Sequence, residues 1–278
     1  MLQSDDDDIA LEVASSRSRS SSSSSSTQGA TDDSDLDDDS DKSSAALAAV
    51  PVLLAVVAIA TDLGTILWGC RHPRVDCTQA YPTLAEASRF RPQQYLYMVG
   101  LCSTSVLWAT TLGLLHWFLR LTLPSSQRLV AHVIAVVGGV ASLALLCLAV
   151  FDTRAHPEGH TAAAVLVITS VWPTLLLVQH ARRQSILFHR PPYGARKRRI
   201  MAVAIGEYGI VLGIVASVGY SWTLLDWVNP FQVASALTIF ETLLVISWSA
   251  VVASVAAEIG ALAPLVEHHD LLTLARQK

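Results

Sequence analysis

Three carboxylates lie inside long apolar stretches of the chain, namely Asp62, Glu207 and Glu241. Even the lower scales put the cost of a charge at the bilayer centre at about 2.5 to 3.5 kcal/mol, so such residues are pointers to function. Glu207 follows a basic cluster by about eight residues, and Glu241 lies about ten residues into its own stretch. At 1.5 Å per residue both are expected about 12 to 15 Å deep, where they could face one another or a common cavity.

No lysine or arginine is expected at that depth to pair with the two glutamates. We therefore expect them to be protonated or hydrogen-bonded to a nearby hydroxyl, of Tyr208, Ser235, Thr238 or Thr242. One interpretation is a proton-coupled or lipid-headgroup site. The other is a polar clamp that holds helices together, which polar side chains also provide in membranes.

A second group of polar residues stands in the sequence FDTRAHPEGH, as Asp152, His156, Glu158 and His160. These residue types bind metals or move protons in other proteins. Here Pro157 interrupts the spacing, and no second ligand set completes a site. We expect a turn followed by a helix start, with no metal and no cofactor.

The elements that position these residues are apolar helices. The chain has 278 residues, 52% of them hydrophobic and only 15% charged, against about 25% charged for a soluble domain. A membrane helix needs about 20 apolar residues, and six runs qualify. They are residues 45–69, 95–119, 129–150, 161–180, 200–220 and 231–257. The sequence predicts an all-α polytopic membrane protein, a bundle of six transmembrane helices over residues 45–258.

Residues 1–44 hold 12 of the 23 acidic residues, 15 serines and almost no large apolar side chain. Such a segment cannot bury enough surface to offset its ordering entropy, so we expect a disordered tail. Residues 259–278 form a second tail. Lysine and arginine favour the cytosolic side, and an even number of spans puts twelve of them with both termini and five opposite. Both tails are therefore expected to be cytosolic.

In this orientation Cys70 and Cys77 face an oxidising compartment, where a small disulfide between them or two reduced thiols are both possible. The opposite, cytosolic loop carries a basic cluster next to the membrane. Such charges attract anionic lipids, so the loop either binds phosphoinositides or simply sets the topology. The cluster expected to face lipid consists of Arg182, Arg183, Arg196, Lys197, Arg198 and Arg199.

Two further patterns concern contacts with other proteins. Glu267, Leu271 and Leu272 have the spacing of an acidic dileucine sorting signal, or they begin a short amphipathic helix. Gly209, Gly213 and Ser217 recur every four positions and predict a helix packing face, within the chain or in a homodimer. The partners expected are membrane lipids and unidentified membrane or cytosolic proteins, and no nucleic acid.

The chain resembles the family of six-span proteins that groups damage-regulated autophagy modulators (DRAM), FGF-receptor-activating-protein-like GPI-remodelling factors and fungal Sfk and CWH-type proteins. Two stretches and one residue carry the likeness: the loop before the second span, the polar turn before the fourth span, and a glutamate in the last span. The matching residues are Pro82, Leu84, Glu86, Pro92, Tyr95, Phe151, His160 and Glu241.

The resemblance implies a non-enzymatic endomembrane protein that supports autophagy, lysosomal trafficking or membrane-lipid handling through partners. It leaves two alternatives open, a GPI-anchor lipid-remodelling factor or enzyme subunit, and a proton-coupled transporter that uses Glu207 and Glu241. No nucleophile elbow, phosphate-binding loop or dinucleotide fingerprint occurs in the sequence, so no motif supports enzymatic activity. Lysosome, endosome, Golgi or endoplasmic reticulum are the expected locations, with the plasma membrane possible.

Overall fold

The computed structural model describes residues 33–73, 75, 77–78, 81–151, 155–185, 196–225 and 230–266. Six helices in this part of the chain are long and apolar enough to cross a membrane. Its regular elements are all helical, so the prediction of an all-α membrane protein is confirmed. The chain divides into two units, residues 1–38 and 39–278, and all six candidate spans lie in the second.

Six long helices make up the bundle. They are α2 (Asp33–Gly69), α4 (Gln93–Thr122), α5 (Arg128–Val150), α6 (Pro157–Gln184), α8 (Arg196–Leu225) and α9 (Pro230–Ser254). Three short elements complete the described part: α3 (Leu84–Ala87), the 3-10 turn η3 (Ser125–Gln127) and α10 (Ala256–Gly260). Residues 33–44, for which the sequence predicts disorder, are thus helical in the structure.

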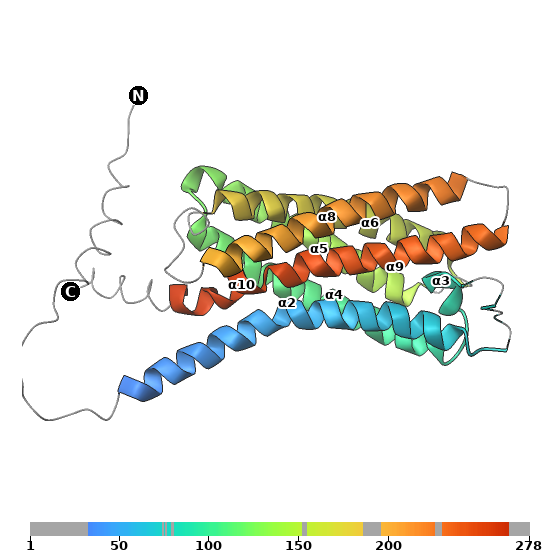
Figure 1. Ribbon diagram of the computed structural model, residues 1–278, viewed down its shortest axis with the longest axis horizontal. Helices are drawn as coiled ribbons and strands as arrows, with labels where there is room; N and C mark the ends of the chain where they lie inside the picture. Colours follow the sequence, from blue (N-terminus) through green and yellow to red (C-terminus); the bar gives the residue numbers. More distant parts are fainter. Residues whose placement is uncertain are drawn as a thin grey trace, which may run out of the picture. The chain divides into compact units, whose positions relative to one another are not determined.

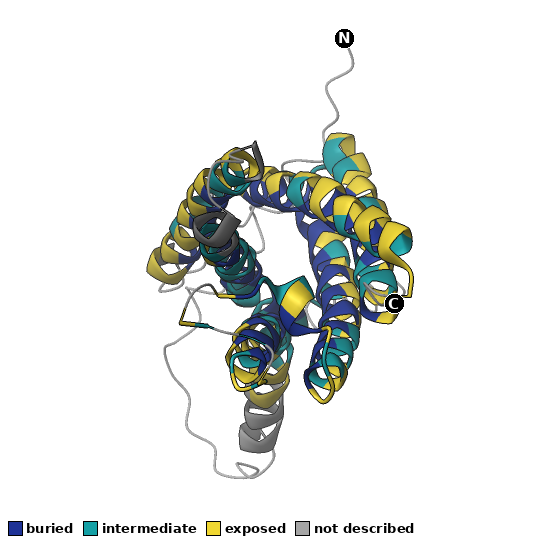
Figure 2. Cartoon of the chain, turned by 90° about the vertical axis from the view of Figure 1, so that its right-hand side faces the viewer, coloured by how far each residue is buried: buried dark blue, intermediate teal, exposed yellow. Residues whose placement is uncertain are grey.

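The long helices surround a central axis (Figure 2). Each of α4, α5, α6 and α8 packs against the next long helix along the chain. α2 lies against α4 and also shares a groove with α9, which closes the ring. Short connections between antiparallel neighbours produce this order. Figure 1 shows α3 at one end of the bundle and α10 at the other, and we refer to the α3 end and the α10 end.

The interior of the bundle is apolar, and so is much of its outer surface. Phe118, Leu119 and Ile134 are at most 1% exposed, whereas Val106 and Val136 on the outside are more than 60% exposed. A helix that is hydrophobic all round belongs in a membrane or in the core of a large protein. The exposed valines therefore fit a lipid environment.

Buried hydroxyl groups are satisfied mainly within their own helices. Thr104, Thr111 and Thr174 each donate a hydrogen bond of 2.8 Å to the carbonyl four residues earlier. Such bonds remove the cost of an unpaired polar group without a partner on another helix. Between α4 and α5, Ser105 and Ser142 donate to each other's carbonyl oxygens at 2.8 and 2.9 Å.

Glycines set the closest approaches between helices. Gly209 of α8 lies against Ser247 and Val251 of α9, and Gly213 lies against Ser247 and against Trp172 of α6. The predicted small-residue face is therefore a packing face inside this chain. Ser217, the third residue of this predicted face, is half-buried on α8.

Gly100 generates a prediction for stability. A Cβ at this position of α4 would overlap the side chain of Thr61 on α2, which is buried and β-branched, so it cannot move aside easily. We expect Gly100→Ala to lower the thermal unfolding temperature in detergent, because overpacking costs about 1 to 3 kcal/mol.

Gly113 of the same helix is the matched control, since a Cβ there would meet no atom within 4 Å. Gly113→Ala should leave stability unchanged or raise it by up to about 1 kcal/mol through helix propensity. Equal melting temperatures for the two variants would contradict the packing seen at Gly100.

Candidate functional site

A short helical turn covers the α3 end of the bundle (Figure 1). We call residues 81–88 the cap. The backbone N–H of Glu86 donates to Thr83 Oγ1 at 3.3 Å, and the N–H of Thr83 donates to Glu86 Oε2 at 3.2 Å. This reciprocal pair is a capping box, which satisfies two free donors at the start of a helix. Gly69 at the end of α2 lets Ala87 approach, since a Cβ on it would come within 2.9 Å of Ala87 Cβ.

Three hydrogen bonds join the cap to α9. Tyr81 N–H donates to Ser235 Oγ at 3.1 Å, and Thr238 Oγ1 donates to the Tyr81 carbonyl at 3.0 Å. The N–H of Leu84 donates to Glu241 Oε2 at 3.0 Å. The three α9 residues are spaced three apart and so share one face of the helix. Glu241 therefore holds a loop backbone, a partner that the sequence does not predict.

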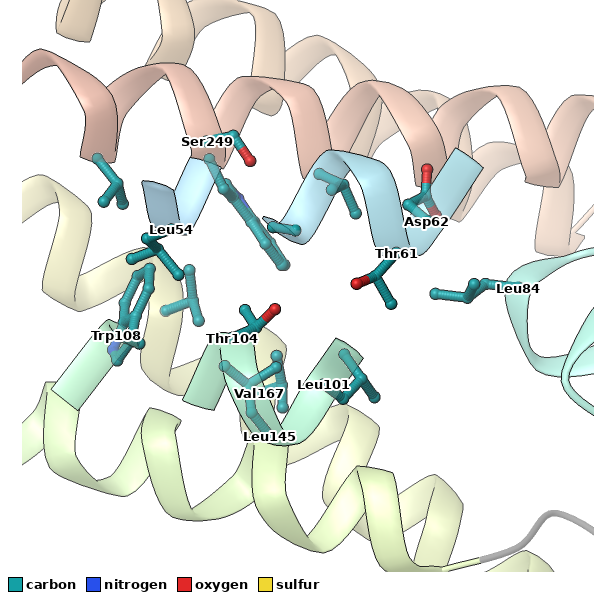
Figure 3. Close-up of a pocket in the computed structure, with 15 residues that line it drawn as sticks. Leu54, Thr61, Asp62, Leu84, Leu101, Thr104, Trp108, Leu145, Val167 and Ser249 are labelled. Atoms are coloured by element: carbon teal, nitrogen blue, oxygen red, sulfur yellow. The ribbon is translucent and has the colours of Figure 1, made fainter. Parts of the chain in front are cut away.

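Beneath the cap the bundle encloses a cavity of about 100 Å³ (Figure 3). Leu84 of the cap lines one side, and Leu101, Trp108 and Val167 line others. A water molecule needs about 10 to 15 Å³ by the same measure, so the cavity has room for several carbon atoms of an apolar chain. A smaller hollow of about 20 Å³ follows toward the α10 end and shares Trp108 and Val252 with the cavity.

Asp62 is the carboxylate in the cavity wall, and it projects from α2 toward α9 (Figure 3). It is only 2% exposed. Thr242 on α9 interacts with it, but neither carboxylate oxygen has a partner of good hydrogen-bond geometry among the described residues. Buried polar groups are nearly always paired in native proteins, so this position calls for an explanation.

The model of the Frag1/DRAM/Sfk1/Cwh43P N-terminal domain family matches residues 46–262. The chain belongs to this family. The predicted resemblance is thereby confirmed, and with it a multi-pass membrane protein. Comparisons with curated proteins and with solved structures give no match.

In this member of the Frag1/DRAM/Sfk1/Cwh43 family, the loop that carries the likeness forms the cap and the start of α4. Pro82 is buried beside Thr83, and Pro92 is the N-cap residue of α4. The guanidinium of Arg91 lies 5.6 Å from the centre of the Tyr95 ring, which is within cation–π range. Of the matching residues in this loop, Leu84 lines the cavity.

The second stretch with the likeness closes the turn between α5 and α6. His160 Nδ1 is 3.0 Å from the Phe151 carbonyl oxygen, and the Phe151 ring meets His156 edge-on at 6.2 Å between centroids. Pro157 is the first residue of α6, as expected for a helix start. Asp152 lies outside the described residues, and the described part of the chain contains no group of three side chains suited to hold a metal.

The pairing of Glu207 differs from the prediction. This residue was expected without a basic partner, but Arg183 at the end of α6 donates to its Oε1 through Nη2 at 2.6 Å. The neighbour Gly206 lies against Ser254, which is 13 residues from Glu241 on α9. At 1.5 Å per residue the two glutamates are about 20 Å apart along the bundle, so they do not face one another. Neither lines the cavity.

A buried ion pair that the sequence does not predict lies at the α10 end. Arg182 of α6 donates to Glu258 of α10 through Nε at 2.8 Å, and its other nitrogens bond to Gln179 and to Ser254. The side chains of Arg182 and Glu258 are only 1% and 8% exposed. An acidic residue just beyond the last apolar run was the one available signal.

The prediction of a basic cluster facing lipid is therefore wrong for part of the cluster. Arg182 and Arg199 are buried, at 2% and 8% exposed. Burial of Arg182 is possible because hydrogen bonds and an opposite charge surround its guanidinium. Lys197 and Arg198 are exposed, as expected of such a cluster, and the side chain of Arg196 lies outside the described part.

The remaining predicted residues lie outside the helices. Cys70 and Cys77 are joined by a disulfide in the loop between α2 and the cap. Glu267, Leu271 and Leu272 fall outside the described residues, so the sorting signal stays a prediction.

The two ion pairs on neighbouring residues of α6 allow a direct comparison. We expect Arg182→Met to destabilise the protein by about 3 to 5 kcal/mol, because it leaves Glu258 buried without its partner. Arg183→Met removes an exposed pair and should cost only about 0 to 1 kcal/mol. Thermal unfolding in detergent measures both.

The double variant Arg182→Met with Glu258→Met separates charge pairing from packing. It should recover most of the stability, because no unpaired charge then remains. A double variant as unstable as Arg182→Met alone would contradict this account.

Proposed function

We propose that this protein is a non-enzymatic endomembrane protein that handles membrane lipids, and that its bundle accommodates a lipid chain in the capped cavity. The supporting observation is an apolar cavity of about 100 Å³ beneath a cap that α9 holds in place. Apolar pockets with few polar groups are the usual form of small-molecule sites. In a bilayer, acyl chains are the apolar molecules at hand.

Family membership supports the same proposal. The uses that the resemblance implies are autophagy, lysosomal trafficking, membrane-lipid handling and lipid remodelling of GPI anchors. All of them act on membranes through lipids or lipid-modifying partners. A lipid-accommodating bundle that works through partners is compatible with each.

The carboxylates give little support to a proton-coupled transporter. Glu207 pairs with Arg183, and Glu241 holds the backbone of Leu84. A carrier site needs ionisable groups that meet near the midplane, whereas these two lie about 20 Å apart at 1.5 Å per residue.

A substitution that fills the cavity tests the proposal. Thr104 of α4 lines the cavity and is 7% exposed. We expect Thr104→Phe to reduce cross-linking of a photoactivatable phosphatidylcholine to protein purified in nanodiscs, because the phenyl ring occupies the space of the chain. The loss should reach about tenfold if the ring removes about 1.4 kcal/mol of binding.

Val106→Phe is the matched control, since Val106 on the same helix is 64% exposed on the outer face. It should label like the wild-type protein, and mass spectrometry should map the wild-type cross-link to cavity residues. Equal labelling of Thr104→Phe and wild type at those residues would contradict the proposed function.

We propose a lysosomal or endosomal membrane as the location, with both termini in the cytosol. The dileucine pattern supports this, together with the autophagy-related members of the family.

The double variant Leu271→Ala with Leu272→Ala should move a tagged protein from lysosomes to the plasma membrane, as seen by microscopy. Lys278→Ala, a change in the same C-terminal segment, is the control and should leave the location unchanged. Lysosomal retention of the double variant would contradict the sorting hypothesis.

A further inference from the structure

Near the α3 end, two hollows meet at the same pair of helices, α2 and α9. The cavity lies on the inner side. On the outer side is a groove of about 280 Å³, lined mainly by Leu63, Ile66 and Leu67 of α2 and by Ile239 and Leu243 of α9. The exposed side chains of Leu63, Leu67 and Ile239 form a surface suited to an acyl chain.

Asp62 and Thr242 lie at the seam between the two hollows. Asp62 lines the cavity, Thr242 lines the groove, and the two side chains interact. The Asp62 carboxylate is 2% exposed, and both of its oxygens lack a hydrogen-bond partner among the described residues. An acceptor so deeply buried needs a donor.

Nearby groups supply no donor of good hydrogen-bond geometry to these oxygens, although Thr242 interacts with the carboxylate. The hydroxyls of Thr61 and Thr104, which also line the cavity, donate to carbonyls of their own helices at 2.7 and 2.8 Å. No lysine or arginine is among the described residues that line either hollow. Glu241, whose carboxylate interacts electrostatically with Asp62, is an acceptor bonded to the cap.

We propose that the seam between α2 and α9 binds a membrane lipid that carries a hydrogen-bond donor, a hydroxyl or a protonated amine, next to its apolar chain. The donor bonds to Asp62, and the chain lies in the groove and the cavity. This inference rests on the proposed function and names the lipid class.

Position and charge both favour such a lipid. Asp62 is seven residues from Gly69 at the end of α2, about 10 Å along the helix. A donor group at the headgroup end of a lipid chain can therefore reach the Asp62 carboxylate. An anionic phosphate would find acceptors here instead of donors, because the carboxylates of Asp62 and Glu241 lie close enough to interact electrostatically. The site thus selects neutral or cationic lipids over phosphoinositides.

Photoactivatable lipids with and without donors test the proposal on the full-length protein in nanodiscs. Sphingosine supplies an amine and hydroxyls, diacylglycerol supplies a hydroxyl, and phosphatidylcholine supplies no donor. We expect the donor-bearing probes to label α2 and α9 peptides about tenfold more than phosphatidylcholine, the ratio that one charge-assisted hydrogen bond provides. The amine and hydroxyl probes show which donor the site prefers.

Asp62→Leu should reduce labelling by the donor-bearing probes to the level of phosphatidylcholine. Asp62→Asn keeps the shape and removes the charge, so it should lower sphingosine labelling more than diacylglycerol labelling. Glu207→Gln, a carboxylate change remote from the seam, should label like wild type. Competition on the wild-type protein by unlabelled sphingosine or diacylglycerol, but not by phosphatidylcholine, needs no variant and covers the case of misfolding.

The outcomes separate the inference from the proposed function. Equal labelling by all probes at α2 and α9, or wild-type labelling of Asp62→Leu, would overturn the inference while lipid accommodation stands. Absence of labelling by every probe at cavity or groove residues would overturn both.

Discussion

The hydrocarbon of a membrane offers no hydrogen-bond partner, so the protein itself has to satisfy every polar group within the bundle. Buried hydroxyls such as Thr111 and Thr174 bond to their own helix. Arg182 is surrounded by acceptors on three sides, including Glu258. The carboxylate oxygens of Asp62 are among the buried polar atoms of the described residues that depart from this pattern, and they give an outside molecule a physical reason to bind.

The cap depends on the same constraint. The residues of α9 that face it have polar side chains inside an apolar helix, and each is satisfied by the backbone of a distant loop. Glu241 and Leu84 are 157 residues apart in sequence. The cap and α9 therefore hold each other in place above the cavity, by hydrogen bonds as well as by packing.

Charge is distributed unequally between the two ends of the bundle. The α10 end has exposed Lys197 and Arg198 near a buried ion pair, whereas the α3 end has Asp62 and Glu241 inside it. Basic side chains at a membrane surface attract anionic lipids. Buried acceptors favour donors instead.

The sequence alone determined the six spans, the all-α class and the family, because the length and hydropathy of a membrane helix are local properties. It also singled out Asp62 and Glu241 as unusual. Only the tertiary structure decided their partners, the burial of Arg182 and the pairing of Arg183 with Glu207. The physical reason is that a helix apolar on all sides gives no sign of which face points inward. Helix rotation and the meeting of residues far apart in the chain are set by packing of the whole bundle.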